Sequence, residues 1–113
     1  MEQPGTRRYI YVAGPYTQGN VTRNVQRVLN AAEELRAYMF TPFVPHLYHL
    51  WDFYKPHDYM FWLSLGLSWI PRCDAVLRLS GESPGSDVEI NRAKELGIPV
   101  YTTADALIHH DKT

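Results

Sequence analysis

The chain has 113 residues and a formal net charge of −1, a size that fits one domain covering residues 1–113. The balance of 11 basic against 12 acidic residues excludes a broad basic face for a nucleic acid polymer. The lone Cys73 excludes a disulfide framework or a multi-cysteine zinc site. Residues 1–8 lack the apolar core of a secretory signal, and no apolar stretch is long enough to span a bilayer. We therefore expect a cytoplasmic protein without a membrane segment.

Strand-like and helix-like segments alternate along the first half of the chain. A β-type run at Arg8–Ala13 is followed by a helix from Asn20 or Thr22 to Met39, whose apolar residues recur every three or four positions. Prolines bracket a short strand at Thr41–Pro45. The segment His46–His57 has no clean period, so we expect a structured loop there.

The next predicted helix, Asp58–Ile70, is apolar on nearly every side, with Asp58 as its N-cap. It carries many of the aromatic residues, which make up 13% of the chain. A helix of this kind has to be covered on more than one face. In so short a chain a second subunit is a plausible cover, so we expect a homodimer or a higher homo-oligomer.

The second half repeats the alternation. A strand at Asp74–Leu79 leads through a Gly/Ser/Pro loop at Ser80–Ser86 into a helix at Asp87–Leu96, which Gly97 ends. A strand at Ile98–Tyr101 and a helix at Thr103–His109 complete the chain. This order predicts a small Rossmann-like or flavodoxin-like α/β domain: a parallel sheet of four to five strands with helices on both faces.

Two loops are expected to meet at the carboxyl ends of the strands. With the common strand order 2-1-3-4, Ala13–Thr17 and Ser80–Glu89 face each other at the point where the order reverses, which is where such sheets bind ligands. The second loop runs into a helix N-terminus, which favours an anion. Glycines there permit close backbone approach and serines supply donors; these residues are Gly81, Gly85, Ser83 and Ser86.

Glu89 has two interpretations. Ser86-x-x-Glu89 matches a capping box, and the pattern alone favours that structural role. The alternative is a carboxylate nucleophile at the crevice. Tyr11 would ordinarily be a core residue, and His46 is a structural or substrate-contacting residue rather than a metal ligand, because nothing secures convergent ligands. We expect neither a metal nor another cofactor.

The segments together resemble the nucleoside 2-deoxyribosyltransferase-like superfamily, which also contains nucleoside 5′-monophosphate N-glycosidases. The matching pieces follow the right order over most of the chain: Tyr11-Val-Ala-Gly-Pro-Tyr16, Pro42-Phe-Val-Pro-His-Leu47, Arg72-Cys-Asp-Ala-Val76 and Ser83-Pro-Gly-Ser-Asp-Val-Glu-Ile-Asn-Arg-Ala93, leading to Gly97-Ile-Pro-Val100. The ordered set is more specific than any one piece.

The resemblance implies a role for each matched position. Glu89 would be the nucleophile that attacks C1′ of the sugar, and Tyr11 would orient its carboxylate. Ser83 matches a serine that binds a 5′-phosphate. The other implied substrate contacts are Gly14, Pro15, Tyr16, His46, Gly85 and Ser86. The partner implied is a small nucleoside or nucleotide.

One departure from the family concerns Gly66. The superfamily commonly has an Asp at this position, eight residues before Asp74, and that Asp takes part in proton transfer to the leaving base. Without it, departure of the base loses a general acid, an effect worth about 10²–10⁴-fold. Asp52, His46 and His49 are the residues that could reach the crevice instead. If the enzyme has decayed, Gly66→Asp should restore turnover.

Two functions follow from these observations. The first is cleavage of the N-glycosidic bond of a nucleoside or (deoxy)nucleoside 5′-monophosphate, by hydrolysis or base transfer, with hydrolysis preferred because of Ser83. The second is a nucleotide-binding module with little or no catalysis. The segment from His46 to Tyr54, with Tyr48, Trp51 and Phe53, is the candidate platform on which a base would stack.

Overall fold

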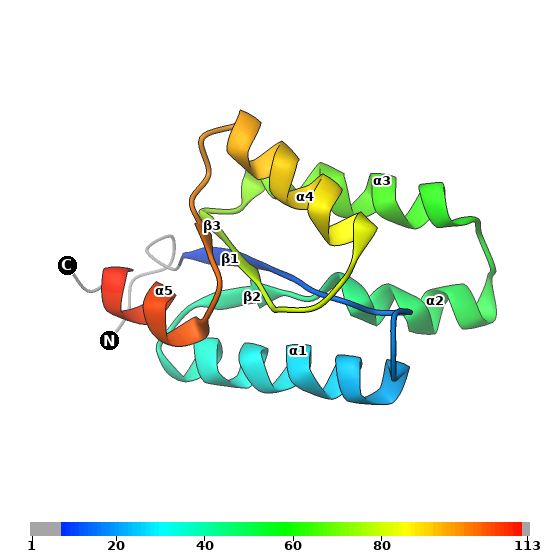
Figure 1. The fold of residues 1–113 in the computed structure, drawn as a ribbon, viewed down its shortest axis with the longest axis horizontal. Helices are drawn as coiled ribbons and strands as arrows, with labels where there is room; N and C mark the ends of the chain where they lie inside the picture. Colours follow the sequence, from blue (N-terminus) through cyan, green and yellow to red (C-terminus); the bar gives the residue numbers. More distant parts are fainter. Residues whose placement is uncertain (1–7, 112–113) are drawn as a thin grey trace.

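The computed structural model describes residues 8–111, and at its centre lies a sheet of four parallel strands (Figure 1). The strands lie in the order β2-β1-β3-β4. This arrangement confirms the predicted α/β class and the predicted strand order. The strand bounds are β1 Tyr9–Ala13, β2 Thr41–Phe43, β3 Ala75–Arg78 and β4 Val100–Tyr101.

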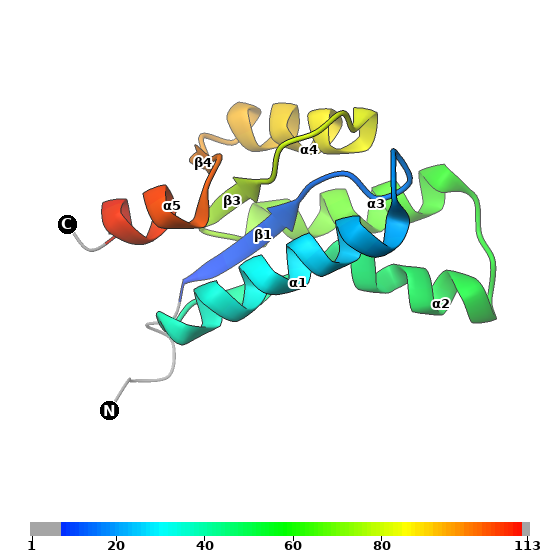
Figure 2. The ribbon, with the colours of Figure 1, turned by 60° about the horizontal axis from the view of Figure 1, so that its bottom comes forward.

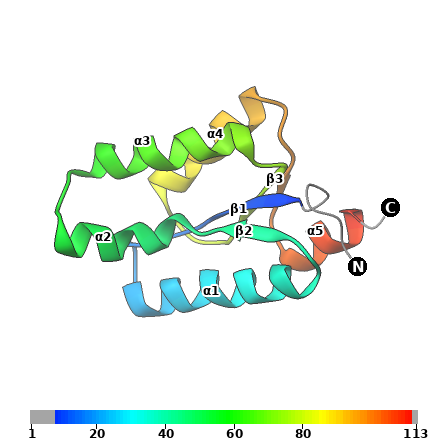
Figure 3. The same ribbon diagram turned by 180° about the vertical axis from the view of Figure 1, so that it is seen from behind.

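Helices cover both faces of the sheet (Figures 1 and 2). Helices α1 (Val21–Ala37) and α5 (Ala104–Asp111) pack on one face, while α3 (Tyr59–Trp69) and α4 (Pro84–Glu95) pack on the other. Helix α2 (Tyr48–Tyr54) runs beside α3, as the view from behind shows (Figure 3). Among residues 8–111, no helix is long and apolar enough to cross a membrane.

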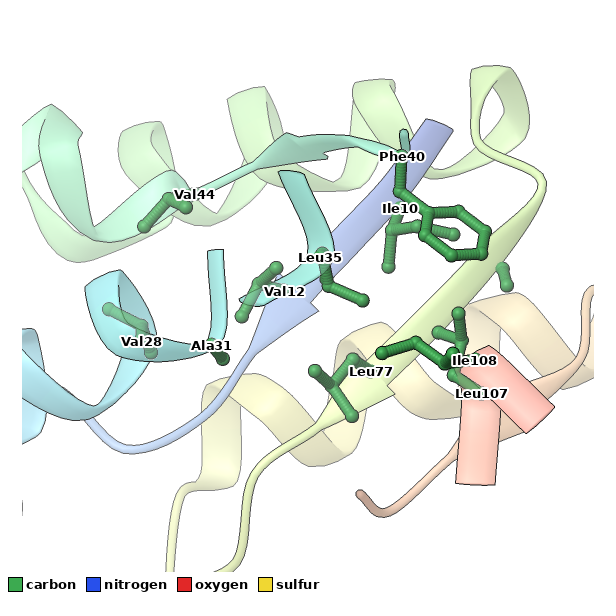
Figure 4. Close-up of a cluster of buried hydrophobic side chains, with 11 residues drawn as sticks. Ile10, Val12, Val28, Ala31, Leu35, Phe40, Val44, Leu77, Leu107 and Ile108 are labelled. Atoms are coloured by element: carbon green, nitrogen blue, oxygen red, sulfur yellow. The ribbon is translucent and has the colours of Figure 1, made fainter. Parts of the chain in front are cut away.

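The two-residue period of β1 sends its side chains into two separate cores. Ile10 and Val12 join the larger core with α1 and α5, where Leu35 and Leu107 are also fully buried (Figure 4). Tyr11 and Ala13 point to the opposite face, into the core under α3 and α4. This alternation puts a buried tyrosine on the face of the sheet that α3 and α4 cover.

Several predicted helix ends are confirmed. Asn20 and Asp58 cap α1 and α3, each accepting a hydrogen bond from the backbone N–H three residues later, at 2.9 and 2.8 Å. Gly97 has φ +74°, and the N–H of Ile98 donates to the carbonyl of Ala93 at 2.9 Å. This is the Schellman ending that a glycine at C′ permits.

The structure corrects two segments. The predicted loop at 46–57 is mostly helical, because a 3₁₀ turn, η1 (Pro45–Leu47), leads directly into α2. Its residues lack a helical hydrophobic period because the helix is largely exposed and none of its residues is fully buried. Helix α4 begins at Pro84 rather than Asp87, since Ser83 is its N-cap and proline is well suited to the first helical position.

Candidate active site

A buried carboxylate and a buried tyrosine form the centre of the site. Glu89 lies in the second turn of α4 and is only 8% exposed, while Tyr11 in β1 is completely buried. The Tyr11 hydroxyl donates a short hydrogen bond to Oε2 of Glu89. The bond joins residues 78 positions apart in the sequence and orients the carboxylate from below.

Electrostatics give the two groups different protonation states. Burial raises the pKa of Glu89 to about 7, against the opposing influence of the Tyr11 hydrogen bond and the positive charge of Arg78. Burial also raises the pKa of Tyr11 well above its ordinary value, and the neighbouring Glu89 charge raises it further. Tyr11 therefore keeps its proton and acts as a donor, while Glu89 titrates near neutral pH.

The capping-box interpretation of Glu89 is wrong. Ser83, not Ser86, is the N-cap of α4, and its hydroxyl accepts from the N–H of Ser86 at 3.2 Å. The hydroxyls of Ser83 and Ser86 also bond each other at 2.9 Å. With the cap three residues earlier, Glu89 lies beyond the first turn, and its carboxylate is bonded by Tyr11 instead.

Arg78 provides a positive charge that acts on the Glu89 carboxylate. It is the last residue of β3, and its guanidinium contacts Oδ1 of Asp87 and the carbonyl of Gly81, at 3.2 and 3.0 Å. Its side chain is only 15% exposed. Because its charge acts on Glu89, Arg78 helps to set the pH range in which Glu89 is ionised.

Above Glu89 lies a cavity of about 590 Å³, at the carboxyl ends of β1 and β3. This is the volume range of small-molecule sites. The loops that were expected to meet do so here. From the first loop and the segment after β2 come Gly14, Tyr16 and His46, and from the start of α4 come Ser83, Gly85, Ser86 and Glu89.

Two of the expected site residues lie behind the wall of the cavity. Tyr11 supports Glu89 from beneath and is not part of the lining. Pro15 is not part of the lining either: its carbonyl accepts a hydrogen bond at 3.0 Å from Nε2 of His46. The amide of Asn24 ties down the same loop by donating to the carbonyls of Tyr16 and Gln18 at 3.0 and 2.7 Å.

Helices α2 and α3 supply the opposite wall. Asp52 lines the cavity, and its Oδ1 accepts from Nε1 of Trp62 at 2.6 Å and from the backbone N–H of His57 at 2.9 Å. These hydrogen bonds hold the pKa of Asp52 below its usual range. The lining residues that the sequence did not single out for the site include His57, Tyr59 and Trp62. His49 and Asp52 both line the cavity and are three positions apart. On a helix this spacing places two side chains on one face, so it is the sequence feature that could have predicted this wall.

The predicted base platform divides in the structure. Tyr48 lines the cavity, but Trp51 lines a separate apolar groove with Leu29 and Pro42. Phe53 lines neither and is 83% exposed. Of the platform residues, Tyr48 therefore remains in the cavity wall, where its ring lies 5.6 Å from that of Trp62, centroid to centroid.

Gly66 lies directly beside the Tyr11–Glu89 pair. A Cβ at this position would come within 2.5 Å of the Tyr11 hydroxyl and 3.1 Å of Oε2 of Glu89. The first distance is shorter than any normal contact, so an aspartate could not be added without displacing the buried tyrosine. If Gly66→Asp restores an acid, it does so only with a shift of the Tyr11 hydroxyl or of α3. Within residues 8–111, no three His, Cys, Asp or Glu side chains converge as metal ligands.

Comparisons with known proteins support the fold assignment. Among solved structures, the chain is similar to a 2-deoxyribosyltransferase from the psychrotolerant bacterium Bacillus psychrosaccharolyticus, with a TM-score of 0.61 and 22% sequence identity. The match covers 81% of this chain and 69% of that one, and it shows that the two chains share a Rossmann-like α/β fold. The chain belongs to the family described as "Domain of unknown function (DUF7768)", whose model matches residues 8–103. A search of curated proteins finds no match.

Proposed function

We propose that the protein cleaves the N-glycosidic bond of a nucleoside or (deoxy)nucleoside 5′-monophosphate, with Glu89 as the nucleophile. The observation that carries this proposal is the buried Glu89 carboxylate, which Tyr11 orients at the base of a cavity of about 590 Å³. The shared fold with a 2-deoxyribosyltransferase supports the same class of chemistry. The partner is a small molecule, not a nucleic acid polymer.

In this reaction a carboxylate oxygen of Glu89 attacks C1′ and the base departs. The product is a glycosyl ester, which water or a second base then resolves. Tyr11 donates a hydrogen bond to Oε2 of the carboxylate. It therefore fixes the attacking group without competing as a nucleophile. Because the pKa of Glu89 is about 7, a large share of the Glu89 side chains carries a negative charge at neutral pH. The Tyr11 hydrogen bond and the charge of Arg78 stabilise that charge only in part against the effect of burial.

The start of α4 suits the sugar or its phosphate. Gly85 and Ser86 open the helix at the cavity wall, where the positive end of the helix dipole favours an anion. Ser83 contributes a hydroxyl beside them. This grouping supports hydrolysis of a monophosphate over transfer between nucleosides.

The test is the release of free base from a panel of ribo- and deoxyribonucleosides and their 5′-monophosphates. Glu89→Gln keeps the shape and the Tyr11 hydrogen bond but removes the nucleophilic charge, so base release should stop. Glu95→Gln makes the same change on an exposed face of the same helix and should keep full activity. Activity that survives in Glu89→Gln would contradict the mechanism.

The second candidate is a nucleotide-binding module with little catalysis. The observation that favours it is Gly66, which leaves no acid beside the nucleophile. This function predicts that a nucleotide raises the melting temperature without free base appearing. Ligand at 100 times Kd should stabilise the protein by about 2.7 kcal/mol.

We also propose a homo-oligomer. Helices α2 and α3 expose large apolar side chains, among them Leu50 at 71% and Met60 at 61%. Exposed apolar groups of this size are typical of association surfaces. Light scattering at micromolar concentration tests this proposal, and a monomer would contradict it.

A further inference from the structure

The proposed reaction leaves one chemical requirement unmet. A base departs from C1′ far more readily when a proton reaches it, and Gly66 offers no acid beside Glu89. We propose that His49 donates this proton from the opposite wall and that Asp52 stabilises its imidazolium form. The inference rests on the proposed N-glycosidic cleavage and names the general acid of that same site.

Helix α2 places the two residues together. His49 and Asp52 are three positions apart, which puts them on one face of the helix, and both line the cavity. The ring of His49 lies 4.9 Å from the ring of Tyr16, which comes from the loop after β1. His49 thus lines the cavity from α2, whereas Glu89 lines the same cavity from α4.

Asp52 is built to remain a carboxylate. The hydrogen bonds from Trp62 and the His57 backbone both end on Oδ1, so they fix the group from one side. Those bonds lower its pKa, and the charges of His49 and His57 act in the same direction. An ionised carboxylate is a poor proton donor, but its negative charge stabilises positive charge that develops on the same face of the helix.

The other candidate donors on the lining are less suitable. His46 is buried, which lowers its pKa, and its Nε2 donates to the carbonyl of Pro15. The ring of His57 stacks on Phe61 at 3.9 Å, so one face is covered. Burial raises the pKa of Tyr16. Within residues 8–111, no Lys or Arg lines the cavity, so the histidines are the basic side chains in its wall.

The step balances as follows. Glu89 forms the bond to C1′, the bond from C1′ to the base nitrogen breaks, and its electron pair remains on the base. The His49 imidazolium gives its proton to the base, which leaves neutral. The neutral imidazole then takes a proton from water as that water attacks C1′ and frees the Glu89 carboxylate. His49 is thus acid in the first half of the reaction and base in the second.

The experiment compares two substrates that differ only in their need for the proton. One is guanosine or its deoxy or 5′-monophosphate form, whichever the panel of nucleosides and nucleotides shows to be cleaved. The other is its N7-methyl derivative, whose base already carries a positive charge and leaves as a neutral molecule. In His49→Ala, release of guanine should fall by about 10²–10⁴-fold, whereas release of 7-methylguanine should stay within a few-fold of wild type.

The controls separate this inference from the proposed function. Glu89→Gln should lose activity on both substrates, and Asp52→Asn should show the His49→Ala pattern more weakly, because it acts through the imidazole. Equal loss on both substrates in His49→Ala, no loss on either, or the selective pattern in His57→Ala instead would overturn the assignment of His49. A wild-type protein that cleaves neither substrate nor any other nucleoside or nucleotide would overturn the proposed function itself. His49 is exposed, so its replacement should leave the melting temperature close to that of wild type.

Discussion

The hydroxyl of Tyr11 lies only 2.5 Å from the position that a Cβ on Gly66 would occupy. The present hydrogen bond between Tyr11 and Glu89 therefore depends on the absence of a side chain at Gly66 in the neighbouring helix α3. Gly66 is itself buried in α3. A side chain at position 66 and the present positions of Tyr11 and Glu89 are thus possible together only if one of these groups shifts.

Gly66→Ala tests this relationship. At an open helical position this change would stabilise a protein by about 1 kcal/mol. Here the added methyl meets the hydroxyl of a fully buried tyrosine, and displacing that side chain strains the packed core, so we expect the free energy of unfolding to fall by about 1–3 kcal/mol. Urea unfolding measures the change.

Two further variants show whether the clash is with the hydroxyl. Gly85→Ala places a methyl 2.6 Å from the hydroxyl of Tyr59, but that side chain is 61% exposed and can swing away, so the cost should be small. In a Tyr11→Phe background, Gly66→Ala should cost clearly less than it does alone. The same cost in both backgrounds would contradict the assigned contact.

Glu89→Gln should make the protein more stable at high pH. The pKa of Glu89 is about 7 when folded and 4.5 when unfolded, so the folded state binds more protons between these values. The free energy of unfolding therefore falls as pH rises through this window, by about 3 kcal/mol in total. A neutral glutamine avoids that loss, so the stabilisation should appear at pH 8 and be absent at pH 4.

The comparison between variants isolates Glu89 from other groups. His46 acts in the opposite direction, because its lowered pKa in the folded state reduces stability as pH falls below its ordinary value. Subtracting the wild-type curve from that of Glu89→Gln removes this contribution. If the difference in the free energy of unfolding between the two proteins does not change with pH, burial does not raise the pKa of Glu89.

Most of the fold could be predicted from the sequence because its elements follow clear periods. The three- and four-residue spacing in α1, the apolar run in β3 and the glycine after α4 each gave the right element. Helix α2 could not be predicted in the same way. It is a short helix with no fully buried residue, and a pattern that depends on burial cannot reveal it.

The site was only partly predictable for a similar reason. The loops after β1 and β3 were placed correctly because topology alone brings them together. The pairing of Tyr11 with Glu89 matched the resemblance, whereas pattern alone favoured a cap. Asp52 was named as a residue that could reach the crevice, but its bonds to Trp62 and His57 could not be predicted, because those partners lie five to ten residues away across a turn.

Ser83→Ala should weaken both the helix and the binding of a phosphate. Loss of the N-cap hydroxyl removes a hydrogen bond to the Ser86 N–H and should cost about 1 kcal/mol of stability. If the same hydroxyl contacts a 5′-phosphate, the KM for a monophosphate should rise more than the KM for the matching nucleoside. Asp58→Ala, which removes the cap of α3, should cost similar stability without this selectivity. Equal effects on both substrates would assign Ser83 a purely structural role.

The pH dependence of cleavage should report the ionisation of Glu89. With the N7-methyl substrate, which needs no acid, kcat/KM should rise with pH and level off above an apparent pKa of about 7. Arg78→Gln removes the charge that favours the ionised carboxylate, so the rise should move to higher pH. Arg78→Lys keeps a positive charge and should move it less. Because an uncharged nucleophile cannot attack, a rate that stays constant across about pH 5.5 to 8 would exclude Glu89 from that role.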